Sequence, residues 1–215
     1  MSILVYIEYI ESIIIYILPS MNNPALTDLE NILKSLTPFD EKEKEDIDFI
    51  ISRIRTTPDI LQETCVEGHV TGSALLLDVS SGKFLLHFHK KVKKWLQFGG
   101  HMDGELNPAD TALREVKEES GIENVYFLPK VTDVLPIDIE IQQIPEYNAK
   151  PAHLHYDFRY LIATDTPEQL NTGLENESNE FAWISIEDID DPKYDLETAA
   201  KRLIKKSYSI WEMNN

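Results

Sequence analysis

Cysteine is nearly absent from this sequence, which has one, Cys65, among its 215 residues. A single cysteine can form no intramolecular disulfide, it excludes a zinc site built from several cysteines, and it favours a reducing compartment. We therefore expect a cytoplasmic protein. Basic residues are also scarce, since 20 Lys and Arg stand against 38 Asp and Glu and give a formal net charge of −18. Because binding to long nucleic acids depends on Lys and Arg, we expect no partner of that kind.

Residues 1–20 are dominated by Ile, Leu, Val and Tyr and contain no Lys or Arg. A secretory signal needs a basic start and a small-residue cleavage site, and neither is present. The apolar run is too short to span a bilayer and carries Glu8 and Glu11, so we expect no stable membrane span. Two interpretations stay open: an upstream start-site artefact, with the protein beginning at Met21, or a hydrophobic extension that is packed or peripheral.

The length predicts one enzyme-sized domain with an extension. We divide the chain into a doubtful hydrophobic segment 1–20, a helical extension 21–60 and a main domain 61–215. Within the extension, apolar residues recur every three or four positions up to Pro38, and a second helix is predicted over 40–55. This helical pair can pack on its own domain or on a second subunit, so a homodimer is one possibility.

Beyond Pro58 the pattern changes to short strands separated by Gly, Asn and Pro. Helices are predicted over 107–120 and 195–208. Strands are predicted over 69–78, 83–89, 95–98, 124–134, 152–163 and 180–186. Strands grouped with a few helices, without strict alternation, indicate the α+β class, with a mixed β-sheet flanked by helices.

The segment 99–122, GGHMDGELNPADTALREVKEESGI, has the features of a capped helix that carries a row of acids. Asn107 can cap the helix, Pro108 suits its first position, and Gly121 can close it in a left-handed conformation. At about 100° per residue, three glutamates lie within an arc of roughly 100° beside the apolar stripe; they are Glu115, Glu118 and Glu119. A bound divalent cation would relieve their mutual repulsion, and Mg²⁺ suits carboxylate oxygens together with substrate phosphates.

This segment resembles the box that defines the Nudix hydrolases. The matching residues are Gly100, Arg114, Glu115, Val116, Glu118, Glu119, Gly121 and Ile122. The resemblance extends from about residue 63 to the C-terminus and implies a Nudix fold, an α/β/α sandwich. One position departs from the pattern, because the loop glutamate of the family falls at Leu106. The nearby acids are Asp103 and Glu105, so the partner of Arg114 is open.

The resemblance implies hydrolysis of the pyrophosphate bond in a nucleoside diphosphate linked to another moiety, assisted by Mg²⁺ or Mn²⁺. By the same resemblance, Glu115 and Glu119 are metal ligands and Gly100 offers its carbonyl. Glu118 is a further ligand or the base that deprotonates the attacking water. Arg114 orients the carboxylates, so Glu118, Arg114 and Glu115 form the expected catalytic set, and the partner is a small-molecule nucleotide substrate.

Residues 153–160 alternate polar and apolar side chains, as a half-buried strand does, and His153, His155, Asp157 and Arg159 share one face. Arg159 and His155 are candidates for substrate contact, and the alternative is an ordinary solvent-facing side of the sheet. A transition-metal site is a weaker interpretation of the His-x-His pattern.

Further candidates lie outside that strand. His101, directly after the paired glycines, is a third candidate for substrate contact or a plain loop residue. Glu177 and Glu180 are candidates for a late ligand or base.

Two functions of different class remain open, a metal-dependent pyrophosphohydrolase and a non-catalytic nucleotide-binding or regulatory module on the same fold. The complete set of glutamates favours catalysis, because a module that only binds would be expected to lose one of them. An isoprenoid diphosphate isomerase would need a cysteine in its cleft, and Cys65 precedes the first predicted strand of the main domain.

Overall fold

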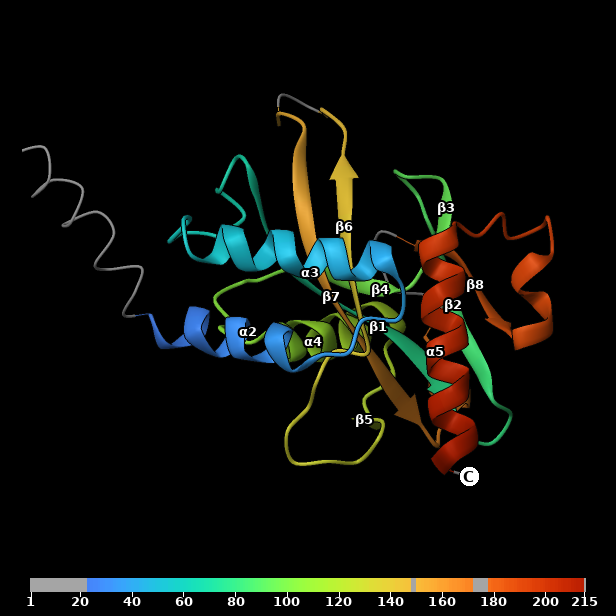
Figure 1. Cartoon of the computed structure of the whole chain (residues 1–215). Helices are drawn as coiled ribbons and strands as arrows, with labels where there is room; N and C mark the ends of the chain where they lie inside the picture. Colours follow the sequence, from blue (N-terminus) through green and yellow to red (C-terminus); the bar gives the residue numbers. More distant parts are fainter. Residues whose placement is uncertain (1–22, 148–149, 172–177, 215) are drawn as a thin grey trace, which may run out of the picture.

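The computed structural model describes residues 23–147, 150–171 and 178–214 (Figure 1). The segment 1–20 and Met21 lie outside the described residues, so both interpretations of the N-terminal segment stand. Across the described ranges, no helix combines the length and the apolar character that crossing a bilayer requires.

Two long parallel strands form the centre of a mixed sheet. β1 (Gly68–Asp78) pairs with β7 (His153–Thr164) along its whole length, from Gly68 opposite Leu154 to Asp78 opposite Thr164. Each strand has two successive antiparallel partners: β4 (Phe98–His101) and β2 (Lys83–His89) on β1, and β6 (Asp138–Ile144) and β5 (Val125–Phe127) on β7. β3 (Lys94–Leu96) and β8 (Ser178–Ile184) extend the sheet from β2. The predicted mixed sheet is confirmed.

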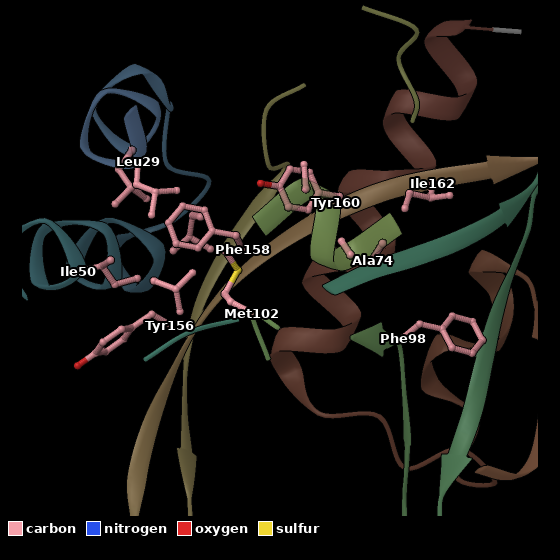
Figure 2. Close-up of a cluster of buried hydrophobic side chains, with 14 of the residues drawn as sticks. Leu29, Ile50, Ala74, Phe98, Met102, Tyr156, Phe158, Tyr160 and Ile162 are labelled. Atoms are coloured by element: carbon pink, nitrogen blue, oxygen red, sulfur yellow. The ribbon is translucent and has the colours of Figure 1, made fainter. Parts of the chain in front are cut away.

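Helices cover both faces of this sheet. α2 (Pro24–Ser35), α3 (Glu41–Ile54) and α4 (Pro108–Ser120) pack on one face, and α5 (Thr198–Asn214) packs on the other. Because side chains alternate along a strand, β1 sends Leu76 into the first cluster, part of which Figure 2 shows, and Leu77 into the second. The result is the expected sandwich of helices around a sheet.

The helical extension shares the core of the main domain. Leu29 of α2 and Ile50 of α3 are buried in the cluster that contains Phe158 of β7 (Figure 2). On α3, Glu43 and Asp46 also accept hydrogen bonds from the backbone N–H groups of Ile139 (3.0 Å) and Ile141 (3.2 Å) on β6. The helical pair therefore packs on its own domain and satisfies the outer edge of β6, and a homodimer stays a prediction.

The sequence prediction was wrong about two strand regions. The predicted strand 124–134 ends at Phe127, and β6 over Asp138–Ile144 was missed. Pro129 interrupts the first segment, and proline has no N–H for a strand ladder. β6 carries acids and glutamines and reaches its hydrogen-bond partners on α3 and β7 only in the folded chain. Residues 95–98, predicted as one strand, divide between β3 and β4.

Candidate active site

The acidic helix α4 begins and ends at the residues that the sequence indicated. The side-chain oxygen of Asn107 accepts a hydrogen bond from the Ala109 N–H (3.0 Å), and Pro108 is the first helical residue. Gly121 has a φ of 71° and its N–H bonds to the Lys117 carbonyl (2.9 Å). Local capping chemistry thus fixes which residues α4 contains, and with them the spacing of its glutamates.

Glycines let α4 approach the sheet closely. A Cβ atom on Gly72 of β1 would lie 2.2 Å from the Pro108 carbonyl oxygen at the start of the helix. A Cβ on Gly100 of β4 would lie 2.2 Å from Oε1 of Glu115. The absence of both side chains places the Glu115 carboxylate directly against the Gly100 backbone.

Arg114 connects the acids with the loop. Its Nη1 donates to Glu115 Oε1 (2.8 Å) and Glu118 Oε2 (3.1 Å), and its Nη2 donates to the His101 carbonyl (3.0 Å). Arginine presents its donors in a rigid planar fork. Arg114 therefore sets the directions of two carboxylates at once.

Glu105 is the loop partner of Arg114. Its Oε1 lies 2.6 Å from Arg114 Nε, while Leu106 is 64% exposed. Glu105 also accepts a hydrogen bond from the Asp103 N–H (2.6 Å), which shapes the turn. The acid that pairs with Arg114 therefore stands one residue before Leu106, the position of the family's loop glutamate. Asp103 takes part through its backbone N–H.

The three glutamates differ in their surroundings. The side chains of Glu115 and Glu119 are 16% and 11% exposed, whereas that of Glu118 is 60% exposed. Burial raises the pKa of Glu115 above its usual range, although the neighbouring Arg114 acts in the opposite direction. Glu119 Oε1 lies 3.9 Å from Nδ1 of His87. The largely buried carboxylates of Glu115 and Glu119 and the solvent-exposed carboxylate of Glu118 therefore lie along the same edge of α4.

The glutamates line a cleft of about 600 Å³ together with Gly99 and Gly100. Polar residues of the sheet line the same cleft, among them Asp157, which is 3% exposed. Asp157 accepts hydrogen bonds from Thr71 (3.1 Å), Ser73 (2.8 Å) and Gln142 (3.2 Å). Asp157 was placed on the polar face of residues 153–160 from the sequence, but Thr71, Ser73 and Gln142 were not selected. The polar residues at the start of 69–78 were the available signal for the first two.

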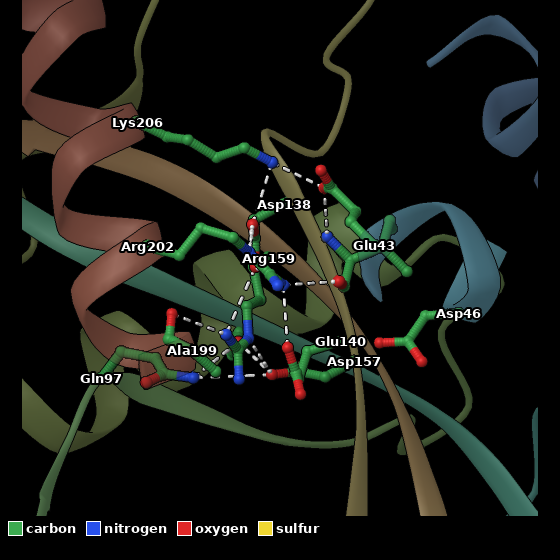
Figure 3. Close-up of polar contacts among 12 residues, drawn as sticks. Glu43, Asp46, Gln97, Asp138, Glu140, Asp157, Arg159, Ala199, Arg202 and Lys206 are labelled. Atoms are coloured by element: carbon green, nitrogen blue, oxygen red, sulfur yellow. Dashed lines mark hydrogen bonds and ion pairs between the residues drawn. The ribbon is translucent and has the colours of Figure 1, made fainter. Parts of the chain in front are cut away.

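The histidine candidates line the cleft, and Arg159 does not. His101 and His155 both face the cleft, with 3.3 Å between their Nε2 atoms. Burial, followed by the nearby imidazoles, lowers the pKa of His155 to about 2. Arg159 is 3% exposed, and its guanidinium donates to Asp157 (3.0 Å) and Asp138 (3.3 Å) (Figure 3). Its expected substrate contact is corrected, because internal carboxylates occupy its donors.

Three other side chains were candidates for a late ligand or base or for the cysteine of an isomerase. Glu180 is exposed and does not line the cleft, and Glu177 lies outside the described residues. Cys65 is buried at a second cavity. No cysteine in the described part of the chain lines the cleft, so the diphosphate isomerase interpretation has no support.

A family model described as the NUDIX domain matches residues 69–206, well over half of the chain. This chain belongs to the NUDIX family. The match includes β1, β4 and α4, which hold the glycines and glutamates of the cleft. It ends within α5, and it leaves α2 and α3 outside the family region although they share its core.

One similar curated protein is named as a pyrophosphohydrolase. A curated protein of Lactococcus lactis subsp. cremoris (strain MG1363), "Probable DHNTP pyrophosphohydrolase", is 33% identical over 98 residues, which are 45% of this chain. The match covers 55% of that protein, so the chain spans about half the length of this relative.

Solved structures share the fold. The structure of a NUDIX family hydrolase from Clostridium perfringens is 24% identical with a TM-score of 0.50, and a C. elegans Ap4A hydrolase binary complex is 20% identical with a TM-score of 0.50. Each comparison covers 68% of this chain and 98% of the other. At these identities the likeness concerns the fold, and it agrees with the expected Nudix architecture.

Proposed function

We propose that this NUDIX-family chain hydrolyses the pyrophosphate bond of a nucleoside diphosphate linked to another moiety, with Mg²⁺ or Mn²⁺ as the cofactor. The observation that carries the proposal is the convergence of Glu115, Glu118 and Glu119 on one cleft. A volume of about 600 Å³ lies within the range of small-molecule sites. We also propose a cytoplasmic location, because a lone cysteine is typical of a reducing compartment.

The charge and donor atoms of the site suit a hard divalent cation. One guanidinium, that of Arg114, faces the carboxylates of Glu105, Glu115 and Glu118, and Glu119 adds a further acid to the same cleft. Carboxylate and carbonyl oxygens favour Mg²⁺ or Mn²⁺ over softer metals. Glu115, Glu119 and the Gly100 carbonyl would hold the ion, with Glu118 as a further ligand or as the base.

The bound ion and the residues of the cleft would have separate roles in catalysis. A bound divalent ion would neutralise charge on phosphoryl oxygens and make water more acidic. Arg114 fixes Glu115 against Gly100 and holds Glu118 Oε2 (3.1 Å). The Glu118 side chain is 60% exposed, so its carboxylate is accessible from solvent and would accept the proton of the attacking water. His101 and His155 also line the cleft and would meet the substrate or shape its pocket.

The first experiment identifies the substrate. The purified chain is incubated with Mg²⁺ and a panel that includes DHNTP, Ap4A, ADP-ribose and NADH in ¹⁸O-labelled water. Release of nucleotide with the label on one phosphate identifies the compound and the attacked phosphorus. If no compound is cleaved while a nucleotide binds with Mg²⁺, the non-catalytic module replaces this proposal.

The second experiment tests the residues on the cleaved compound. Glu118→Gln should lower the rate by roughly 100-fold or more, the usual worth of a positioned general base. Glu115→Gln and Glu119→Gln should lower it and raise the Mg²⁺ concentration needed for half-maximal rate. The matched control is Glu123→Gln, because Glu123 is 78% exposed and pairs only loosely with Lys117 (3.7 Å). Equal rates for wild type and the three cleft variants would refute the assignment.

A further inference from the structure

Four imidazoles meet beside the cleft, at one end of the central strands. His69 lies on β1 directly opposite His155 on β7, His153 precedes it by two residues, and His101 ends β4. The ring centroid of His69 lies 4.9 Å from that of His155, 5.0 Å from that of His101 and 5.1 Å from that of His153. None of the four belongs to the glutamate set on α4.

Backbone carbonyls fix the tautomers of two of these rings. Nδ1 of His69 lies 3.3 Å from the Cys65 carbonyl, and Nδ1 of His153 lies 2.8 Å from the Pro151 carbonyl. A carbonyl only accepts, so each Nδ1 carries the hydrogen and each Nε2 keeps its lone pair. His69 is 2% exposed and its Nε2 is buried without a hydrogen-bond partner. Histidine ligands in metal sites typically hold their second N–H in this way.

The other Nε2 atoms are as close as ligands of one ion. Nε2 of His155 lies 3.2 Å from Nε2 of His153 and 3.3 Å from Nε2 of His101. If all rings are neutral and the proton of His153 is on Nδ1, then Nε2 of His155 must carry a hydrogen to bond to Nε2 of His153. The same atom must carry no hydrogen if it is to accept one from Nε2 of His101, so the two contacts cannot both be simple hydrogen bonds. Two nitrogens bound tetrahedrally at about 2.0–2.1 Å from zinc are separated by about 3.3 Å, which matches both contacts. One ligand atom each from His69, His101 and His155 also fall within 4.8 Å of one another.

We propose that His69, His101 and His155 bind a transition-metal ion of the Zn²⁺ class, with His153 or a solvent molecule as the fourth ligand. The donors are all imidazole nitrogens, which suit zinc, cobalt and nickel, whereas the α4 glutamates suit Mg²⁺. Glu63 Oε1, 3.8 Å from His101 Nδ1, is placed to orient that ring. The ion would tie β1, β4 and β7 together at the wall of the cleft.

Solvent reaches this cluster from two sides. His101 and His155 line the main cleft, and His69 and His153 line a second cavity of about 420 Å³. An ion can therefore enter without unfolding of the sheet. The assignment gives His101 and His155 a role as ligands in place of direct substrate contact, and it does not depend on which reaction the cleft performs.

Co²⁺ is the probe for this site, because it reports tetrahedral coordination by its visible absorption. The full chain is treated with a chelator, saturated with Mg²⁺ and titrated with Co²⁺. We expect one Co²⁺ per chain and loss of the absorption when Zn²⁺ displaces it. His69→Gln and His155→Gln should each weaken Co²⁺ binding by more than about 100-fold, beyond the 10- to 100-fold typical of losing an outer-shell partner.

Two controls separate this site from other binding. His89→Gln removes an imidazole of β2 whose Nδ1 accepts backbone N–H groups and which is outside the cluster. Glu115→Gln removes a ligand of the glutamate set. Both should retain the Co²⁺ absorption, and circular dichroism without metal verifies that each variant folds. If His69→Gln does not fold, His101→Gln replaces it, because that side chain is 37% exposed. Unchanged Co²⁺ binding in the histidine variants, or loss of the absorption in Glu115→Gln alone, overturns the proposal.

Discussion

The substitution Gly100→Ala should displace the Glu115 carboxylate and lower the rate, with little loss of the stability of the fold. The new Cβ would lie 2.2 Å from Glu115 Oε1, and real Cβ contacts do not fall below 3.0 Å, so the carboxylate must move by about 0.8 Å. A displacement near 1 Å at a catalytic group costs on the order of 100-fold in rate, or about 2.7 kcal/mol of barrier. The clashing atoms belong to the end of a flexible side chain, so we expect a loss of unfolding free energy below about 1 kcal/mol.

Gly82→Ala is the matching control, a substitution that should lower stability and leave the rate nearly unchanged. Gly82 has a φ of 67°, and its Cβ would lie 2.4 Å from the rigid indole of Trp211, far from the residues that line the cleft. We expect it to lose about 1–3 kcal/mol of stability with a nearly unchanged rate. Urea unfolding measures stability, and release of product from the identified substrate measures rate. A Gly100→Ala rate within about threefold of wild type would show that Glu115 is not held against Gly100 during the reaction.

Three further changes test the contacts of Arg114, the buried ion pairs of Asp138 and the packing of α3 on the core. Arg114→Lys keeps the charge and loses the planar fork, so the rate should fall by about 10- to 100-fold with a smaller change in melting temperature; equal rates would remove the positioning role. Asp138 is buried, and although burial alone would raise its pKa, Arg202 and the neighbouring cations lower it below 3.8. Its contribution is therefore present above about pH 4 and lost as pH falls through the lower folded pKa. Asp138→Asn should cost about 3–5 kcal/mol at pH 7 and abolish this acid dependence, measured by urea unfolding across pH. Ile50→Ala should cost about 2–5 kcal/mol in one cooperative transition if α3 belongs to the main core, and a separate early transition would contradict this.

Features encoded locally could be predicted from the sequence. The capping residues and the spacing of the glutamates specify α4, because helix geometry alone decides which side chains share an edge. The two central strands were likewise predicted, over 69–78 and 152–163, the second with support from the alternation in residues 153–160. The family resemblance then predicted the sheet architecture that the comparisons confirm.

Features that depend on long-range pairing could not be predicted. In the sequence, β6 is an acidic and amide-rich segment without a clear strand pattern. Only the folded chain brings Glu43 and Asp46 of α3 to accept hydrogen bonds from its backbone N–H groups. Arg159 shares a strand face with His155, yet it is buried because Asp138 from β6 reaches its guanidinium. Strand alternation gives the face of a side chain and not what covers that face.

The sequence by itself determined that a capped helix carries three acids along one edge after a pair of glycines, because those facts depend on neighbours within one or two helical turns. Only the tertiary structure decided that Glu105 is the partner of Arg114, that Asp157 lines the same cleft as the glutamates, and that four histidines from three strands converge beside it. The pair of Glu105 and Arg114 depends on the conformation of the loop before α4. The other two depend on the pairing of distant strands, which brings together residues up to 86 positions apart, as in the bond between Thr71 and Asp157.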